Sequence, residues 1–293
     1  MANELTVFSR ELAEVAGKAG KSVVAVDARP RFGSSGVFWR PGIVVTAEHT
    51  IRREEEIEIA LPDGGKTAAT VVGSDPGTDI AVLKLDGHAG DAPALVQGDP
   101  AVGNLALGIS RSPDSGVNAT MGIVSAVSGS WRTWRGGKLD RYIRLDLTMF
   151  PASSGGLVVN TEGEAIGIAT SALSRIAGLA IPVSTVNRVV DEILERGHVA
   201  RGYLGLGLQP VELPDHHKGL IVLSLQPDGP AAKSGVLIGD VMVSLGGTPV
   251  TDTDDIQSAL ESRNAGEKID AGVVRGGAAL TIGVMIGERP RRN

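Results

Sequence analysis

The chain has 293 residues, enough for about two domains, and its 42% of hydrophobic and 21% of charged residues are ordinary for a globular protein. A formal net charge of −6 and the lack of a Lys/Arg stripe argue against a nucleic-acid-binding protein, and the absence of cysteine excludes disulfides and cysteine-based sites. No run reaches the ~18 apolar residues of a membrane span, and the N-terminus does not resemble a signal peptide. We therefore expect no membrane span and a cytoplasmic protein, or a periplasmic (extracytoplasmic) one if a leader has been removed.

The first predicted element is a short helix within residues 1–20. Leu5, Phe8, Leu12 and Val15 recur at spacings that place them on one helix face. Gly17 and Gly20 follow and are expected to end the helix. The pattern predicts a helix that docks before the first strand.

Short β-like runs separated by glycine, proline and aspartate then continue as far as residue 183. The first group comprises residues 22–28, 42–47, 56–61, 79–85 and 120–127. The second comprises residues 141–147, 156–160, 164–170 and 178–183. Two groups of strands without intervening helices predict two antiparallel β-barrels packed together.

A helix over 186–197 follows, with Ser184 or Thr185 as its expected N-cap and Gly197 as its stop. Its apolar stripe consists of Val189, Val190, Ile193 and Leu194. Beyond it, strands are expected near 203–208, 219–225, 240–246 and 279–285, with a short helix after the turn at 228–235 and a longer one at 254–262. The predicted organisation is an N-terminal helix (1–20), a two-barrel domain (21–198), a smaller domain (199–288) and a basic tail (289–293).

Three segments carry residues suited to nucleophilic catalysis. His49 ends a β run, Asp79 opens another, and Ser154 lies in Pro-Ala-Ser-Ser-Gly-Gly. A serine hydroxyl needs a neighbouring base, an imidazole can accept and return its proton near neutral pH, and a carboxylate fixes the imidazole tautomer. Glycines after the serine let backbone amides face a developing oxyanion. The order His–Asp–Ser is that of the chymotrypsin barrels.

Each residue alone has an ordinary structural explanation: a core histidine, a turn aspartate, a turn serine. Their joint order on predicted strand ends favours a catalytic triad. Other serine, aspartate and histidine residues are less suited to the triad because of the segments in which they lie. Gly33–Gly36 resembles the serine turn but precedes the histidine, so a loop leading into a strand is expected, and Asp75 is interpreted as a turn residue. The remaining histidines, which lack suitable partners, are His88, His198, His216 and His217.

The sequence resembles the HtrA (DegP-type) family of trypsin-like serine proteases over nearly its whole length. The matching segments are 33–37, 46–49, 75–85, 122–126, 153–156, 163–168, 178–183 and 201–206. The resemblance implies a mostly β fold, a chymotrypsin-like double antiparallel β-barrel followed by an α+β PDZ domain. It implies that His49 is the general base, Asp79 its orienter and Ser154 the nucleophile, with the amides of Ala152, Ser153 and Ser154 at the oxyanion hole.

One departure from the family pattern concerns that hole. The family usually has Gly-Asn-Ser-Gly-Gly around the nucleophile, whereas this chain has Ala152 in place of the first glycine. If that position requires a positive φ, the Cβ costs roughly 1–2 kcal/mol. The hypothesis is a low basal activity that ligand binding raises, and unchanged turnover of Ala152→Gly would refute it.

The resemblance also implies the binding sites. Met149, Ser171 and Ala172 occupy positions around the specificity pocket, where the absence of an acidic residue predicts a small or medium aliphatic side chain rather than Arg or Lys before the scissile bond. In the PDZ unit, the segment Tyr203-Leu204-Gly205-Leu206 matches the carboxylate-binding loop. Ile256 and Leu260 are expected either to line the peptide groove or to be core residues.

By the same resemblance the protein is an ATP-independent, protein-quality-control endopeptidase of unfolded chains, in which peptide C-termini bound at the PDZ groove regulate activity. The resemblance also implies a homotrimer whose subunits contact one another through Phe8, and it implies no metal or other cofactor.

Two alternative functions remain. A catalytically silent PDZ scaffold or chaperone gains weight from the altered serine turn. An α/β-hydrolase is disfavoured because its serine precedes the acid and the histidine.

Overall fold

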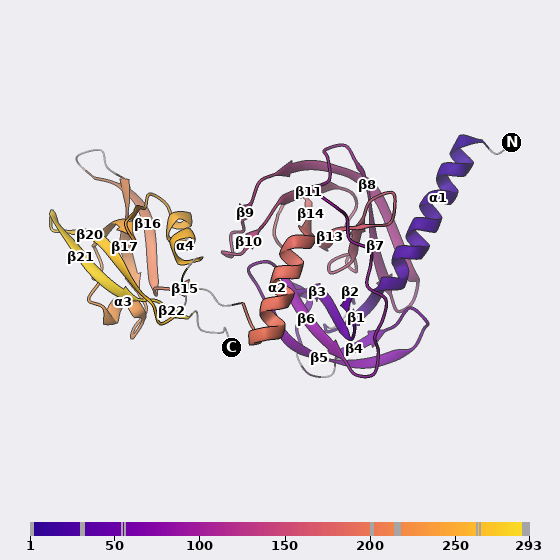
Figure 1. The fold of residues 1–293 in the computed structure, drawn as a ribbon, viewed down its shortest axis with the longest axis horizontal. Coiled ribbons are helices and arrows are strands. Elements are labelled where there is room, and N and C mark those ends of the chain that lie inside the picture. The colour runs from indigo at the N-terminus through magenta and orange to yellow at the C-terminus, as the bar shows by residue number, and fades with distance from the viewer. Residues whose placement is uncertain are drawn as a thin grey trace. The chain divides into compact units, whose positions relative to one another are not determined.

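A computed structural model describes residues 3–29, 33–53, 55, 57–199, 202–213, 218–261, 263 and 265–288. The chain divides into two compact units, Met1–Val199 and Ala200–Asn293 (Figure 1). Among the described residues, no helix combines the length and apolar character needed to cross a bilayer.

The first unit begins with helix α1 (Glu4–Ala19), which Asn3 caps by accepting a hydrogen bond from the Leu5 amide. The predicted stop at Gly17 is wrong, because the helix continues to Gly20, where a Cβ would lie 2.8 Å from Val117. The last turns of α1 pack on the core, whereas its first turns extend into solvent, with Leu5 73% exposed (Figure 1).

The first barrel is a closed antiparallel sheet in the order β1-β2-β3-β6-β5-β4. Its strands are β1 (Val23–Asp27), β2 (Ser34–Arg40), β3 (Ile43–Ala47), β4 (Ile57–Ala60), β5 (Lys66–Asp75) and β6 (Ile80–Leu85). Successive side chains of a strand point to opposite faces. Accordingly Val24 faces the barrel interior, while its neighbour Val23 faces the core shared with the second barrel.

The second barrel has the order β11-β14-β13-β12-β7-β8. Its strands are β7 (Leu105–Ser112), β8 (Gly116–Ser128), β11 (Tyr142–Asp146), β12 (Leu157–Val159), β13 (Ala165–Thr170) and β14 (Gly178–Pro182). A small hairpin, β9 (Trp131–Arg132) and β10 (Lys138–Leu139), lies between β8 and β11. The mostly β, double-barrel fold class is confirmed. The run 120–127, predicted in the first group, belongs to the second barrel.

Helix α2 (Val183–Arg196) covers the region where the barrels meet. It begins at Val183, three residues before the predicted start, and its N-cap is Pro182, so neither predicted N-cap is correct. The Thr185 hydroxyl instead accepts a hydrogen bond from the Asp140 amide within the protein interior. Val189, Val190 and Ile193 are fully buried as predicted and Gly197 ends the helix in the left-handed conformation, but Leu194 is 39% exposed.

The second unit contains a sheet in the order β16-β17-β18-β20-β21, with β19 paired to β18. Its strands are β15 (Gly202–Tyr203), β16 (Leu206–Glu212), β17 (Lys218–Leu225), β18 (Val241–Leu245), β19 (Thr248–Pro249), β20 (Lys268–Arg275), β21 (Ala278–Met285) and β22 (Gly287–Glu288). Its helices are α3 (Pro230–Lys233) and α4 (Thr253–Glu261). Among the described strands, β16 lies at an edge of the sheet, so one side of its backbone has no neighbouring strand there.

Candidate active site

The pairing of β3 with β6 brings the histidine and the aspartate together. Ala47 pairs with Ile80, so the 3₁₀ turn after β3, which carries His49, lies beside Asp79 at the start of β6. The Glu48 amide donates to the Asp79 carbonyl at 3.1 Å. The register of β3 and β6 therefore brings these two side chains together, although they are 30 positions apart in the chain.

The Asp79 carboxylate is fully buried and accepts three donors. His49 Nδ1 lies 3.0 and 2.9 Å from its two oxygens, the His49 amide donates to Oδ1 at 2.9 Å, and the Thr170 hydroxyl donates to Oδ2 at 2.5 Å. Asp79 has φ of +61°, a strained conformation of the kind that concentrates at functional sites. The arrangement assigns the proton to Nδ1 and leaves Nε2 free to act as a base.

Thr170 and Glu48 were not found by sequence reasoning. Thr170 ends β13 of the second barrel, so its bond to Asp79 locates the site where the two barrels meet. Glu48 precedes His49, and the Arg135 guanidinium lies 3.4 Å from its carboxylate. Burial, and then the charge of Asp79, raise the pKa of Glu48, whereas Arg135 opposes the shift. A carboxyl next to a histidine at a strand end was the signal available for Glu48.

Ser154 lies in the turn between β11 and β12 and is 4% exposed. Its hydroxyl is 3.0 Å from the hydroxyl of Ser171, and its carbonyl accepts a hydrogen bond from the Ser35 amide. Ser171 follows Thr170 directly, which ties the serine turn to the Asp79 carboxylate. Within the described part of the chain, the Ser154 hydroxyl makes no hydrogen bond with His49.

The three amides proposed for the oxyanion hole differ in the structure. The Ser153 amide donates to the Phe150 carbonyl at 2.8 Å, so it is already used within the turn and the expectation that it serves the hole is not supported. The amides of Ala152 and Ser154 have no acceptor among the described residues. The condition for strain at Ala152 is not met, because Asp79 and Asp228 are the non-glycine residues with positive φ in the described ranges.

The residues predicted for the specificity pocket flank this turn. Met149 is partly buried against the interior of the second barrel, and a Cβ at Gly178 would lie 2.9 Å from its Cγ. Ser171 is exposed, and the Ala172 amide donates to the Thr170 hydroxyl at 3.1 Å. These contacts place the Met149 side chain against Gly178 and the core of the second barrel.

Of the residues that the sequence analysis judged less suited to the triad, one segment contacts the serine turn. His88 and His198 bond to nearby backbone carbonyls at the surface. Asp75, interpreted above as a turn residue, is instead the last residue of β5, and it accepts hydrogen bonds from Gly77 and Thr78 of the turn that follows. His216 and His217 lie outside the described residues. The segment in contact with the serine turn is 33–36, most of which is not a loop: Ser34–Gly36 belongs to β2, and the Ser35 hydroxyl contacts the serine turn.

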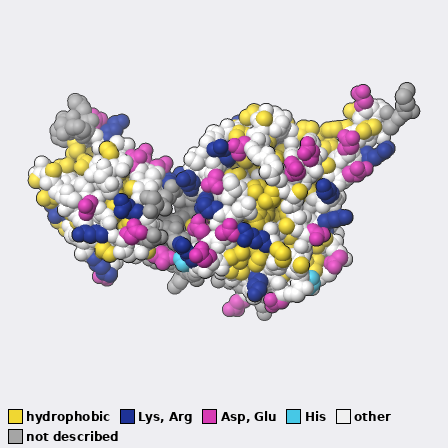
Figure 2. All heavy atoms as spheres, in the orientation of Figure 1, with side chains coloured by type: hydrophobic (Ala, Val, Ile, Leu, Met, Phe, Trp, Pro, Cys, Tyr) yellow, Lys and Arg dark blue, Asp and Glu magenta, His cyan; other side chains and the backbone are white. Residues whose placement is uncertain are grey.

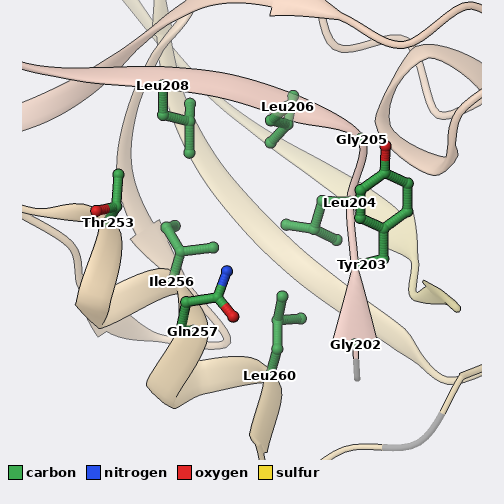
Figure 3. Close-up of a pocket in the computed structure, with 10 residues that line it drawn as sticks. All are labelled: Gly202, Tyr203, Leu204, Gly205, Leu206, Leu208, Thr253, Ile256, Gln257 and Leu260. Atoms are coloured by element: carbon green, nitrogen blue, oxygen red, sulfur yellow. The ribbon is translucent and has the colours of Figure 1, made fainter. Parts of the chain in front are cut away.

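A groove in the second unit lies between α4 and β16 (Figure 3). Its walls include all six residues predicted for peptide binding, namely Tyr203, Leu204, Gly205, Leu206, Ile256 and Leu260. Ile256 and Leu260 both line this groove and belong to the hydrophobic core of the unit. The amides of Leu204 and Gly205 have no acceptor among the residues described.

Comparisons with known proteins agree with these two sites. Residues 33–168 match the trypsin-like peptidase domain family and residues 202–286 the PDZ domain family. The chain is 34% identical over 289 residues to a probable periplasmic serine endoprotease, DegP-like, of Brucella suis, covering 94% of this chain and 56% of the relative. A DegP-like protein of Pseudomonas putida is 33% identical over 273 residues, covering 88% and 56%. The chain thus spans a little over half the length of these curated relatives.

Solved structures give a similar result. The serine endoprotease from Yersinia pestis superposes with a TM-score of 0.79 at 29% identity, covering 94% of this chain and 98% of that one. The HtrA-type protease AlgW with a tripeptide superposes with a TM-score of 0.74 at 30% identity, covering 96% and 98%. These superpositions extend over both the double-barrel unit and the second unit of the chain. The chain belongs to the HtrA family of serine proteases.

Proposed function

We propose that the protein is an ATP-independent serine endopeptidase of unfolded polypeptides, with Ser154 as nucleophile, His49 as general base and Asp79 as its orienter. The observation that carries the proposal is the fully buried Asp79 carboxylate bonded to His49 Nδ1 where the barrels meet. The names of the relatives support it, since those reported above are serine endoproteases.

In this mechanism the Ser154 hydroxyl leaves Ser171 and turns to His49 Nε2, which takes its proton as Oγ attacks the substrate carbonyl. The developing imidazolium is stabilised by Asp79, and the ring then returns the proton to the leaving amine. The amides of Ala152 and Ser154 are the proposed donors to the oxyanion. The residues Met149, Ser171 and Ala172, none of which is acidic, support a preference for a small or medium aliphatic residue before the scissile bond.

A fluorophosphonate probe, which reacts with activated serines, tests this proposal. We expect the wild-type protein to be labelled covalently without nucleotide, and we expect Ser154→Ala to abolish labelling and cleavage of an unfolded protein such as reduced casein. Ser184→Ala is the matched control, because Ser184 is exposed on α2. Labelling of Ser154→Ala at the wild-type rate would contradict the assignment.

A second candidate function is a PDZ scaffold or chaperone without peptidase activity. The observation that favours it is the resting contact of the Ser154 hydroxyl with Ser171 rather than with His49. No labelling of the folded wild-type protein, with or without a peptide at the groove, would support this alternative.

We propose that the second unit, approximately residues 199–288, binds the C-terminus of a peptide and that binding regulates the peptidase unit. The peptide adds as a strand to the edge of β16, and the amides of Leu204 and Gly205, which have no acceptor within the described part of the unit, capture its carboxylate. The apolar walls of the groove favour a hydrophobic C-terminal residue (Figure 3).

Leu208→Glu tests this binding mode. Leu208 is partly exposed on β16 and faces the groove (Figure 3). A carboxylate there would be desolvated by the peptide and would repel its C-terminus, so we expect the Kd for a hydrophobic C-terminal peptide to rise about tenfold or more. Leu223→Glu, on β17 and 53% exposed, is the control and should bind normally in the same calorimetric titration. Equal weakening by both variants would exclude the proposed groove.

We further propose a periplasmic location and a homotrimer. The location follows the relatives named above as periplasmic, which do not support the cytoplasmic expectation. For assembly, the supporting observation is that Leu5, Val7 and Phe8 are exposed on the part of α1 that extends from the barrels. Figure 2 shows hydrophobic and acidic side chains together along this helix.

A further inference from the structure

The turn that precedes the nucleophile has each of its first three carbonyls bound. The Phe150 carbonyl accepts the Ser153 amide at 2.8 Å, the Pro151 carbonyl accepts Arg29 Nη2 at 2.9 Å, and the Ala152 carbonyl accepts the Ser35 hydroxyl at 2.7 Å. Only the first bond is internal to the turn. The other two donors belong to the segment around the start of β2, more than 100 positions earlier.

The bond to Arg29 fixes a peptide unit that matters for catalysis. In a trans peptide the carbonyl and the following amide point in opposite directions, and the described residues contain no cis peptide. Because the Pro151 carbonyl points at Arg29, the Ala152 amide points the other way. That amide has no acceptor within the described ranges, as an oxyanion donor requires before substrate binds.

Arg29 is itself held in place. The same Nη2 donates to the Gly33 carbonyl at 3.1 Å, and the side chain is partly buried. Burial, and then the charge of Arg52, lower the pKa of Arg29, but a guanidinium remains charged at neutral pH. Its hydrogen bond to Pro151 is therefore charge-assisted and stronger than one from a neutral donor.

We propose that Arg29 is a positioning residue for the oxyanion hole: its guanidinium holds the Pro151–Ala152 peptide so that the Ala152 amide is presented to the substrate carbonyl oxygen. This inference rests on the proposed peptidase function. Without the guanidinium, rotation of the peptide would replace the amide by a carbonyl oxygen, which repels a developing negative charge. Arg29 thereby fixes the orientation of the peptide that precedes Ala152, the residue that stands where the family usually has glycine.

Arg29→Met, which keeps the length of the side chain but removes its donors, tests the proposal. We expect kcat for a peptide substrate to fall about 10- to 100-fold with KM changed less than about threefold, since complete loss of one oxyanion donor costs about 10²- to 10³-fold. Arg29→Lys, which keeps one charged donor, should recover part of the loss. Arg53→Met is the control, because Arg53 lies at the surface and pairs with Asp27.

A second measurement separates positioning from a structural role. The affinity for a peptide boronate, whose adduct places an oxygen in the hole, should fall in parallel with kcat, while the affinity for an unreactive product peptide should not change. Wild-type kcat in Arg29→Met, or an equal loss of affinity for both peptides, would overturn the inference while leaving Ser154-dependent cleavage intact. A wild-type protein whose turnover does not depend on Ser154 would overturn the proposed function and this inference with it.

Discussion

Replacing Asp79 by asparagine is expected to lower kcat about 10⁴-fold with little change in KM. The carboxylate has acceptors for the His49 amide, for His49 Nδ1 and for the Thr170 hydroxyl, whereas an asparagine has one acceptor oxygen and one amide group. If that oxygen stays with the His49 amide, the asparagine NH₂ faces Nδ1, which must then be unprotonated. The ring proton moves to Nε2, and the base can no longer accept the proton of Ser154. Single-turnover cleavage of a peptide ester measures the effect.

Asp75→Asn is the matched control for Asp79→Asn. Asp75 is also buried, at 3% exposure, and it accepts three hydrogen bonds from Gly77 and Thr78, none of which involves the His49 ring. This variant should lose stability yet keep kcat within about tenfold of the wild type. A kcat of Asp79→Asn within tenfold of the wild type would remove Asp79 from the proposed triad.

The positions of many strands, though not their order in the sheets, could be predicted because these strands alternate or are uniformly apolar and end at glycine, proline or aspartate. Strand β2 was missed because small residues resemble a loop. Its Gly36 is small for a packing reason, since a Cβ there would lie 2.6 Å from Val44. Strand β20 was missed for a similar reason: a Cβ at Gly272 would lie 2.3 Å from the Ser244 hydroxyl. Close approach of neighbouring strands is a tertiary requirement that local pattern does not reveal.

The start of α2 is decided by tertiary contacts and not by the intrinsic helix propensity of its residues. Val183 and Thr185 are β-branched and have modest helix propensity, which favours a later start. In the structure both lie in the helix, because Val183 packs on the shared core and the Thr185 hydroxyl binds the Asp140 amide. The apolar stripe predicted that the helix exists but not where its first turn begins.

At the site, His49, Asp79 and Ser154 could be proposed from the sequence because each residue type has a recognised chemical role and the three follow a known order. The hydrogen bonds that hold these residues and the serine turn in place could not be predicted from the sequence. Thr170 to Asp79, Ser35 to Ala152 and Arg29 to Pro151 join positions 91 to 122 residues apart. Hydroxyls and a guanidinium at those positions have no local pattern that distinguishes them from surface residues.

Replacing Gly155 by alanine is expected to destabilise the protein and to reduce kcat/KM at least about 10²-fold. Gly155 has φ of +81°, where a Cβ costs roughly 1–2 kcal/mol. That Cβ would also lie 2.1 Å from the Ser35 carbonyl oxygen and 2.6 Å from the Thr46 hydroxyl. Since neither neighbour is the far end of a flexible side chain, the turn must move, and Ser154 and its amide must move with it. Urea unfolding and kcat/KM for a peptide substrate measure the two effects.

Gly163→Ala separates backbone strain from displacement of the nucleophile. Gly163 also has φ of +81°, in the turn between β12 and β13, but the nearest atom to its Cβ, in Val15, would be 3.8 Å away. It should therefore lose only the strain term, roughly 1–2 kcal/mol of unfolding free energy, and keep wild-type kcat/KM. Because both variants carry the same φ, the difference between them isolates the packing of the serine turn against β2. Equal losses of stability and activity in both would mean that the packing of Gly155 against Ser35 does not position Ser154.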